Sequence, residues 1–240
     1  MIVSIVTITR NNAAGLLRTI GSVRSQKGVD IEHIIVDGNS TDGTELILRA
    51  EAPRAVIVRR NPAGVYDALN AGLAQVRGFI TGVLHAGDEF SDPYVLADVL
   101  QAFRTEPAPH YIYGDIHYAA PSGRRYSGRH ASRISLLHGY APPHPSLFVA
   151  SHVQRTVGNY RTDMVTAADF EMFIRLFFDD RLRGKYLNRD MVCMDSHGIS
   201  GKWMNRIFVN NRERLAALRG NGLKASPLSL LKRYIYLFRQ

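Results

Sequence analysis

The stretch that decides the fold is residues 79–90, with the sequence Phe-Ile-Thr-Gly-Val-Leu-His-Ala-Gly-Asp-Glu-Phe. Its apolar part, residues 80–84, predicts a short buried strand in a parallel sheet. Ligands of open α/β sheets bind beyond the carboxyl ends of such strands, which is where Asp88 stands. Gly87 leaves room for a ligand, and the Asp88 carboxylate suits Mg²⁺ or Mn²⁺ carrying a phosphate. The alternative is that Asp88 caps the helix that follows Asp92.

The residues before this stretch repeat the same strand-and-helix pattern. Apolar, β-branched strands are predicted over residues 2–9, 31–36 and 55–58. Helical spacing of apolar residues follows each of them, and the third helix is predicted over residues 66–76. Asp37 ends the second strand, and Asp42 or Thr41 is expected to cap the helix that begins near Thr44. Four repeats in a row predict an α/β fold with a mostly parallel sheet flanked by helices.

The second half of the chain is less regular. Its predicted elements are a helix over 94–103, strands over 111–113 and 116–118, a hairpin into 124–126, a strand over 146–149, a helix over 167–178 and a strand over 186–194. We interpret the loop-rich stretch 128–145 as a lid or acceptor loop, because long irregular segments in compact domains are usually functional or mobile. Asp169 opens the Phe-rich helix, where it either caps the helix or serves as a general base.

Composition and charge limit the possible classes of function. The chain has 240 residues, a hydrophobic content of 45% and a net charge of +9, so nucleic acid, an anionic membrane surface and phosphorylated substrates are all possible partners. One cysteine, Cys193, excludes an internal disulfide and is expected to be a small buried hydrophobe. No targeting segment or membrane-spanning run is found, which predicts a cytoplasmic protein, soluble or peripheral.

The last residues form a basic, aromatic-containing amphipathic pattern. Leucine, isoleucine and tyrosine residues alternate with Lys232, Arg233 and Arg239 in residues 226–240. Such a helix is typical of a membrane interface, and the alternative is a C-terminal helix packed on the domain.

Five segments of the sequence resemble the family-2 glycosyltransferases, which have the GT-A fold. In chain order they are Ser4–Asn11, Ile34–Thr44, Gly64–Gly72, Leu84–Asp88 and Ala167–Glu171. The second segment matches the family signature Val-Asp-Gly-x-Ser-Thr-Asp-Gly-Thr, and the third matches Gly-Ile-Tyr-Asp-Ala-Met-Asn-x-Gly of one subgroup. The resemblance implies a GT-A domain over residues 1–200, followed by a basic helical extension over 201–240.

The resemblance also implies an activity and a set of site residues. The enzyme would be an inverting glycosyltransferase that moves a sugar from a nucleoside diphosphate sugar to a saccharide or polyprenyl-linked acceptor in bacterial surface polysaccharide synthesis, at the inner face of the plasma membrane. Asp169 would be the catalytic base, and Asp88 would hold Mg²⁺ or Mn²⁺. The donor would be bound by Thr7, Thr9, Asn11, Asp37, Tyr66, Asp67, Asn70 and Asp88.

The metal motif departs from the usual family pattern, because Gly87 stands where many relatives have an aspartate. Metal binding should therefore depend largely on the donor diphosphate, and His197 is either a further ligand or a structural residue. We expect Asp37, Asp88 and Asp169 to meet in one cleft at the edge of the sheet.

Two other classes of function compete with this interpretation. A sugar-1-phosphate nucleotidyltransferase shares the α/β architecture, but it would usually carry a Gly-rich phosphate loop where this chain has Thr9–Asn12. A basic module that binds nucleic acid is permitted by the charge. The sequence shows neither a recognition-helix pattern nor a sheet with interleaved basic and aromatic residues, so no nucleic acid partner is expected.

Overall fold

The structure is a computed structural model that describes residues 1–119, 123–195 and 203–238. The strands are β1 Ile2–Thr9, β2 Asp30–Asp37, β3 Val56–Arg59, β4 Ile80–Val83, β5 Glu89–Phe90, β6 Tyr111–Tyr118, β7 Arg125–Tyr126, β8 Phe148–Ala150 and β9 Gly184–Met194. The helices are α1 Ala13–Arg24, α2 Thr44–Glu51, α3 Val65–Leu73, α4 Val95–Phe103, α5 Arg133–Leu137, the 3₁₀ helix η1 His144–Ser146, α6 Ser151–Val157, α7 Ala168–Phe178, α8 Trp203–Gly220, α9 Pro227–Leu231 and α10 Arg233–Phe238.

One mixed sheet runs through the molecule in the order β3-β2-β1-β4-β8-β6-β9-β5, and β7 pairs with β6. The first four strands are parallel, as the repeated pattern predicts. Strand β8 then joins β4 to β6 with antiparallel pairing on both sides, while β6 and β9 are parallel. The prediction of an α/β fold with a sheet flanked by helices is confirmed.

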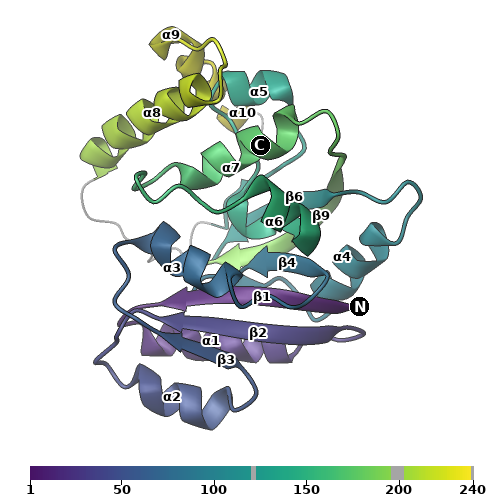
Figure 1. Ribbon diagram of the computed structural model, residues 1–240, viewed down its shortest axis with the longest axis vertical. Helices are drawn as coiled ribbons and strands as arrows, with labels where there is room; N and C mark the ends of the chain where they lie inside the picture. Colours follow the sequence, from purple (N-terminus) through teal and green to yellow (C-terminus); the bar gives the residue numbers. More distant parts are fainter. Residues whose placement is uncertain (120–122, 196–202, 239–240) are drawn as a thin grey trace.

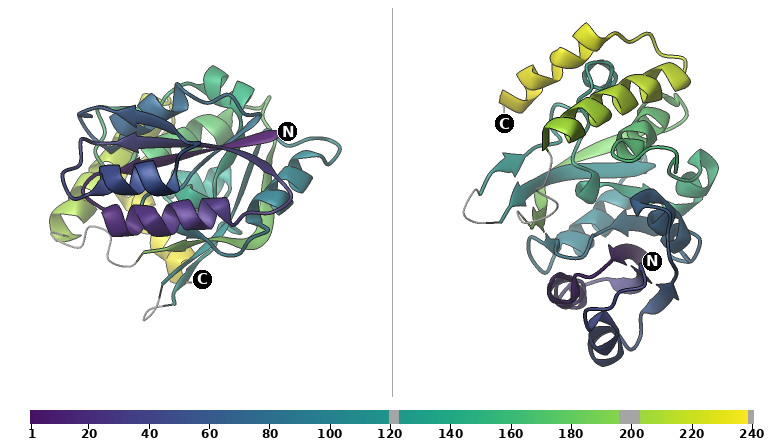
Figure 2. Two further views of the ribbon diagram at one scale, coloured as in Figure 1. Left: turned by 90° about the horizontal axis from the view of Figure 1, so that it is seen from below. Right: turned by 90° about the vertical axis from the view of Figure 1, so that its left-hand side faces the viewer.

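Helices cover both faces of the parallel half of the sheet (Figure 1). On one face, α1 and α2 pack on β2 through a cluster that contains Leu16, Ile35 and Leu48. On the other face, α3 packs on β1 and β2 through the main core, which includes Val6 and Leu69. Helices α8, α9 and α10 lie at the opposite end of the molecule from α1 and α2 (Figures 1 and 2).

Gly72 permits the close contact between α3 and the sheet. A Cβ atom at this position would lie 2.4 Å from Val6 Cγ1 and 3.1 Å from Val36 Cγ2. We predict that Gly72→Ala lowers the free energy of unfolding by about 1–3 kcal/mol, because the core must shift to admit the methyl group. Urea denaturation measures this loss. The matched control is Gly21→Ala in α1, where a Cβ would meet nothing within 4 Å, and this change should be neutral or stabilising.

The structure also changes several details of the predicted elements. The two short strands predicted over 111–118 form the single strand β6, which has a register irregularity near Asp115. The stretch 128–145 is not wholly irregular, because Ser132 caps the short helix α5 through a capping box with Ser135. Cys193 is partly exposed, whereas the sequence predicted a buried side chain. His197 lies outside the described residues.

Helix α8 joins the main core although it belongs to the predicted extension. Its residues Ala217 and Leu218 are fully buried in the same apolar cluster as the first strands, and α8 contacts α7. Glu213 accepts hydrogen bonds from the backbone N–H groups of Val165 and Thr166, just before α7. We therefore propose that residues 201–240 extend one continuous core and do not fold as a separate unit.

Candidate active site

The carboxyl ends of β1, β2 and β4 meet at one edge of the sheet. Thr9, the last residue of β1, pairs with Asp37, the last residue of β2. Beyond β4, the Ala86 N–H donates to the Ile8 carbonyl at 3.2 Å, so the chain follows β1 toward the same edge. Parallel strand ends leave backbone groups and polar loop residues together at this edge. This arrangement brings the segments that carry Asp37 and Asp88 to the same edge, on either side of β1.

Asp37 and Asn11 shape the loops at this edge. Asp37 is buried, and its Oδ1 accepts the N–H of Ser40 at 3.1 Å, so this carboxylate caps the turn that follows β2. Asn11 Oδ1 accepts the N–H of Thr41 at 2.8 Å, and the Asn11 N–H donates to Ser40 Oγ at 2.8 Å. These two hydrogen bonds hold both loops together. The N-cap of α2 is Gly43 and not Asp42 or Thr41, although the Asp42 carboxylate accepts from the N–H of Thr44, the first residue of α2.

Asp88 is 5% exposed and does not cap a helix. Its Oδ1 accepts the Asp195 N–H, and the turn before α4 is closed instead by Asp92, whose Oδ1 accepts the Tyr94 N–H at 2.8 Å, so the helix-capping alternative for Asp88 is wrong. The backbone around Asp88 is fixed by Thr19, whose hydroxyl accepts the Gly87 N–H and donates to the Asp88 carbonyl. Gly87 has a φ of +109°, a conformation that favours glycine.

The electrostatic surroundings of Asp88 suit a cation. Burial raises the pKa of Asp88 to about 6, the negative charge of Asp195 acts in the same direction, and the hydrogen bond from the Asp195 N–H opposes it. A hard divalent cation would offset the desolvated charge of Asp88, while Asp195 Oδ2 already pairs with Arg18 Nη2 at 2.6 Å. Among the residues that the structure describes, no group of three or more His, Cys, Asp or Glu is placed to hold a metal. A donor diphosphate would have to complete such a site.

Asp169 lies in the first turn of α7, partly exposed. Its Oδ1 accepts the N–H of Phe170 at 2.8 Å and the hydroxyl of Tyr66 at 3.3 Å. Tyr66 comes from the first turn of α3, within the predicted Gly64–Gly72 segment, so two motifs that are far apart in the sequence meet here.

A cluster of aromatic side chains borders Asp169. Tyr66 stacks on Tyr160 with ring centroids 5.9 Å apart, and the Tyr160 hydroxyl lies 2.8 Å from His144 Nε2. His144 in turn stacks on His85, which stands three residues before Asp88. Burial, followed by the neighbouring His144, lowers the pKa of His85 to about 4, and burial also lowers the pKa of His144. Both imidazoles are therefore neutral near pH 7, and they link the surroundings of Asp88 to those of Asp169.

Arg214 in α8 supplies positive charge to this cluster. Its guanidinium donates to the Gly139 carbonyl and to Asn210 Oδ1, and it lies 4.4 Å from the centroid of the Phe170 ring. Burial lowers the pKa of Arg214, and the negative charge of Asp169 is the largest effect that opposes this. Sequence reasoning did not identify Arg214, because it lies in the predicted extension and outside every motif.

The remaining predicted donor residues have partners within the protein. The Thr7 hydroxyl is buried 2.9 Å from His33 Nε2, and Asp67 accepts from Arg60 and from the Ala63 N–H. The side-chain amide of Asn70 donates to the Tyr160 carbonyl and accepts the Tyr160 N–H. Their direct contact with a donor stays a prediction. Thr9 differs, because its Oγ1 is buried with no hydrogen-bond partner among the described residues.

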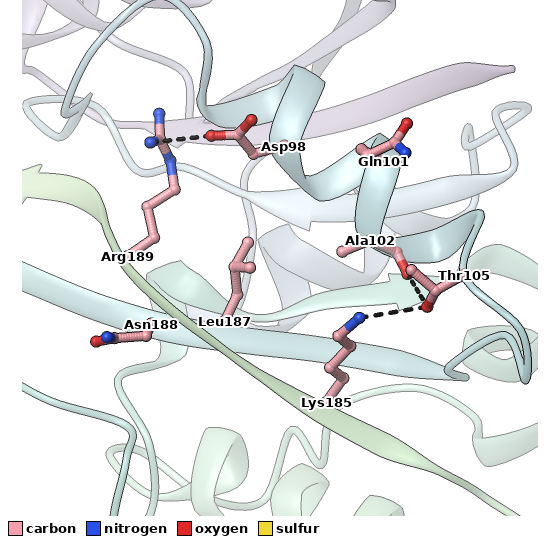
Figure 3. A pocket seen from close by; sticks show the side chains of 8 residues that line it. All are labelled: Asp98, Gln101, Ala102, Thr105, Lys185, Leu187, Asn188 and Arg189. Atoms are coloured by element: carbon pink, nitrogen blue, oxygen red, sulfur yellow. Dashed lines mark hydrogen bonds and ion pairs between the residues drawn. The ribbon is translucent and has the colours of Figure 1, made fainter.

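A surface pocket of about 380 Å³ lies elsewhere, between α4 and β9 (Figure 3). Its charged side chains are already engaged: Arg189 pairs with Asp98, and Lys185 donates to Thr105. None of the predicted site residues lines this pocket.

Comparisons with known proteins agree with the geometry. The family model described as glycosyl transferase family 2 matches residues 4–178. An uncharacterized glycosyltransferase of Mycobacterium tuberculosis is 33% identical over 177 residues, which cover 72% of this chain and 68% of that protein. A PGL/p-HBAD biosynthesis glycosyltransferase of Mycobacterium bovis is 29% identical and covers 81% of this chain and 77% of its own length.

Solved structures share the fold. Staphylococcus aureus TarS 1–349 in complex with UDP-GlcNAc superposes with a TM-score of 0.73 at 14% identity, covering all of this chain and 73% of that chain. Glucosyl-3-phosphoglycerate synthase of Mycobacterium tuberculosis, in complex with Mn²⁺ and UDP, gives a TM-score of 0.66 at 18% identity, covering 93% of this chain and 81% of the other. The fold is GT-A, and the chain belongs to glycosyl transferase family 2.

Proposed function

We propose that this glycosyltransferase is an inverting, metal-assisted enzyme that transfers a sugar from a nucleoside diphosphate sugar to an acceptor hydroxyl. The observation that carries the proposal is the hydrogen bond from the Tyr66 hydroxyl to Asp169, which joins the Gly64–Gly72 segment to the first turn of α7. In this proposal, Asp37 and Thr9 contact the nucleoside of the donor. Family membership argues against the alternative of a sugar-1-phosphate nucleotidyltransferase.

In the proposed reaction, Asp169 accepts the proton of the acceptor hydroxyl while that oxygen attacks C1 of the donor sugar. The bond between C1 and the diphosphate oxygen breaks at the same time, through an oxocarbenium-like state, and the anomeric centre inverts. Tyr66 orients the carboxylate, and Arg214 supplies positive charge near it. Asn70 keeps Tyr160, and with it the stacked Tyr66 ring, in place.

Asp88 and Asp195 would hold the divalent ion, Mg²⁺ or Mn²⁺. When bound, such an ion neutralises charge on the leaving diphosphate. Support comes from the buried Asp88 carboxylate and from structural relatives whose complexes contain Mn²⁺, including a Pyrobaculum calidifontis mannosyltransferase with GDP-Man.

For the acceptor, we propose a saccharide or polyprenyl-linked saccharide of bacterial surface polysaccharide synthesis. The relatives named for PGL/p-HBAD biosynthesis, which is glycolipid synthesis, support a lipid-linked acceptor. A polyprenyl-linked acceptor would place the reaction in the cytoplasm, at the inner face of the plasma membrane. Within the described residues, no helix combines the length and hydropathy needed to cross a bilayer.

A thermal-shift screen of UDP-, GDP- and dTDP-sugars, with and without Mn²⁺, tests the donor class. At a concentration of about 100 times Kd, the matching donor adds about 2.7 kcal/mol of stability, and the melting temperature should rise by roughly 5–10 °C. The rise should be larger with Mn²⁺. Nucleoside monophosphates, which lack the diphosphate, serve as the control. A screen without any shift, or pyrophosphate release from a nucleoside triphosphate and a sugar 1-phosphate, would contradict the proposal.

A further inference from the structure

The positive charge of the protein is concentrated in its last 40 residues. Residues 201–240 contain nine lysines and arginines but only one acidic residue, Glu213, so this segment carries +8 of the net charge of +9. Glu213 is engaged with the backbone just before α7. The remaining 200 residues are almost neutral. The described part of the basic segment forms α8, α9 and α10 at one end of the molecule (Figures 1 and 2).

Helices α9 and α10 are fixed to the domain by one face. Leu230 is buried and packs against Gly139, where a Cβ atom would lie 2.8 Å from Leu230 Cδ2. The Tyr236 hydroxyl lies 2.9 Å from His138 Nδ1, and its ring stacks on Tyr140 with centroids 5.1 Å apart. The inner face therefore has the partners expected of a docked C-terminal helix, as the packing alternative predicted.

The outer face of the same helices is apolar and exposed. Leu228 is 75% exposed and Leu231 57%, and they lie one turn apart on α9, while Ile235 of α10 is 51% exposed. Lys224 and Lys232 are exposed beside them, and the charge of Lys232 contributes to the lowered pKa of His138 after burial. The docked helices α9 and α10 thus expose aliphatic side chains near positively charged ones.

We propose that this face, defined by Leu228, Leu231 and Ile235 with the basic residues around them, docks on an anionic phospholipid surface. The aliphatic side chains would insert at the boundary between headgroups and acyl chains, and the lysines and arginines would contact lipid phosphates. The concentration of positive charge favours a lipid partner over a second copy of this chain, because two such faces would repel each other. The proposal is independent of the sugar donor and of the acceptor.

Co-sedimentation of the full-length protein with vesicles tests this surface. Wild type should bind vesicles in which roughly a third of the lipid is phosphatidylglycerol and should bind phosphatidylcholine vesicles at least tenfold more weakly. The triple variant Leu228→Ser, Leu231→Ser, Ile235→Ser should lose at least tenfold in partition coefficient at every salt concentration. The double variant Lys232→Gln, Arg233→Gln should lose roughly tenfold or more at low salt and less at high salt.

The matched control is Leu46→Ser in α2, because Leu46 is 71% exposed at the other end of the molecule. This variant should bind as wild type does. Circular dichroism checks folding, and the single variant Leu228→Ser replaces the triple variant if that chain does not fold. Wild-type binding by the folded outer-face variant would overturn the proposal. Equal binding to both vesicle types, or a protein dimer that this variant dissociates without any vesicle binding, would also overturn it.

Discussion

Asp169→Asn is expected to lower kcat by about 10²- to 10⁴-fold while the affinity for the nucleotide-sugar donor stays unchanged. Asparagine has nearly the shape of aspartate and can still accept the Phe170 N–H and the Tyr66 hydroxyl, so the first turn of α7 should survive. It cannot accept the acceptor proton as a carboxylate does. Turnover assays and donor titration by calorimetry, on the same preparation, separate the two effects.

Two further variants sharpen this test. Tyr66→Phe removes the hydroxyl that donates to Asp169 but keeps the ring that stacks on Tyr160, so a smaller loss, roughly tenfold, is expected. Asp163→Asn changes an exposed aspartate that precedes α7 and pairs with Arg161, and it should leave turnover unchanged. If Asp169→Asn transferred sugar at the wild-type rate, the assignment of the base would be wrong.

The sequence predicts the strand ends well because their signal is local. Alternating β-branched residues locate β1 and β2, and the polar residues directly after an apolar run, such as Asp37, must come to the edge of the sheet. Parallel pairing of the first four strands follows from their repeated helical crossovers. The antiparallel insertion of β8 between β4 and β6 does not follow, because pairing order depends on contacts between segments that are far apart in the chain.

The surroundings of Asp169 were only half predictable for a related reason. Tyr66 belongs to a specific motif that is recognisable in the sequence. His144 and Arg214 come from a loop-rich stretch and from the C-terminal helices, and only the packed structure brings them to α7. The sequence contains a local signal for α5, which is the capping box of Ser132 and Ser135. The signal is weak because serine stands where glutamate or glutamine is usual.

Asp88→Asn is expected to lower kcat/KM by about 10²- to 10³-fold and, in metal-free buffer, to raise the stability of the protein. Burial raises the pKa of Asp88 from its ordinary value near 4 to about 6. A carboxyl group with a raised folded-state pKa contributes most to stability below its unfolded pKa, and that contribution is lost as the pH rises through about 6. At pH 8 the buried charge therefore costs about 3 kcal/mol, at 1.36 kcal/mol for each pKa unit.

Asparagine carries no charge at any pH, so the variant avoids this cost. Its advantage in the free energy of unfolding should approach about 3 kcal/mol at pH 8 and shrink toward zero as the pH falls to 4. Urea denaturation at several pH values, in a chelating buffer, measures the difference. The control Asp180→Asn changes a largely exposed aspartate that pairs with Arg133 and should alter neither stability nor activity.

The opposite signs of the two effects distinguish a functional carboxylate from a structural one. A residue retained for packing or for hydrogen bonding would lose stability and activity together when it is changed. A desolvated carboxylate retained for a divalent cation loses activity while the metal-free protein gains stability, and added Mn²⁺ with donor should stabilise wild type much more than the variant. A variant that is less stable than wild type at pH 8, or that keeps the full response to Mn²⁺, would remove Asp88 from the proposed metal site.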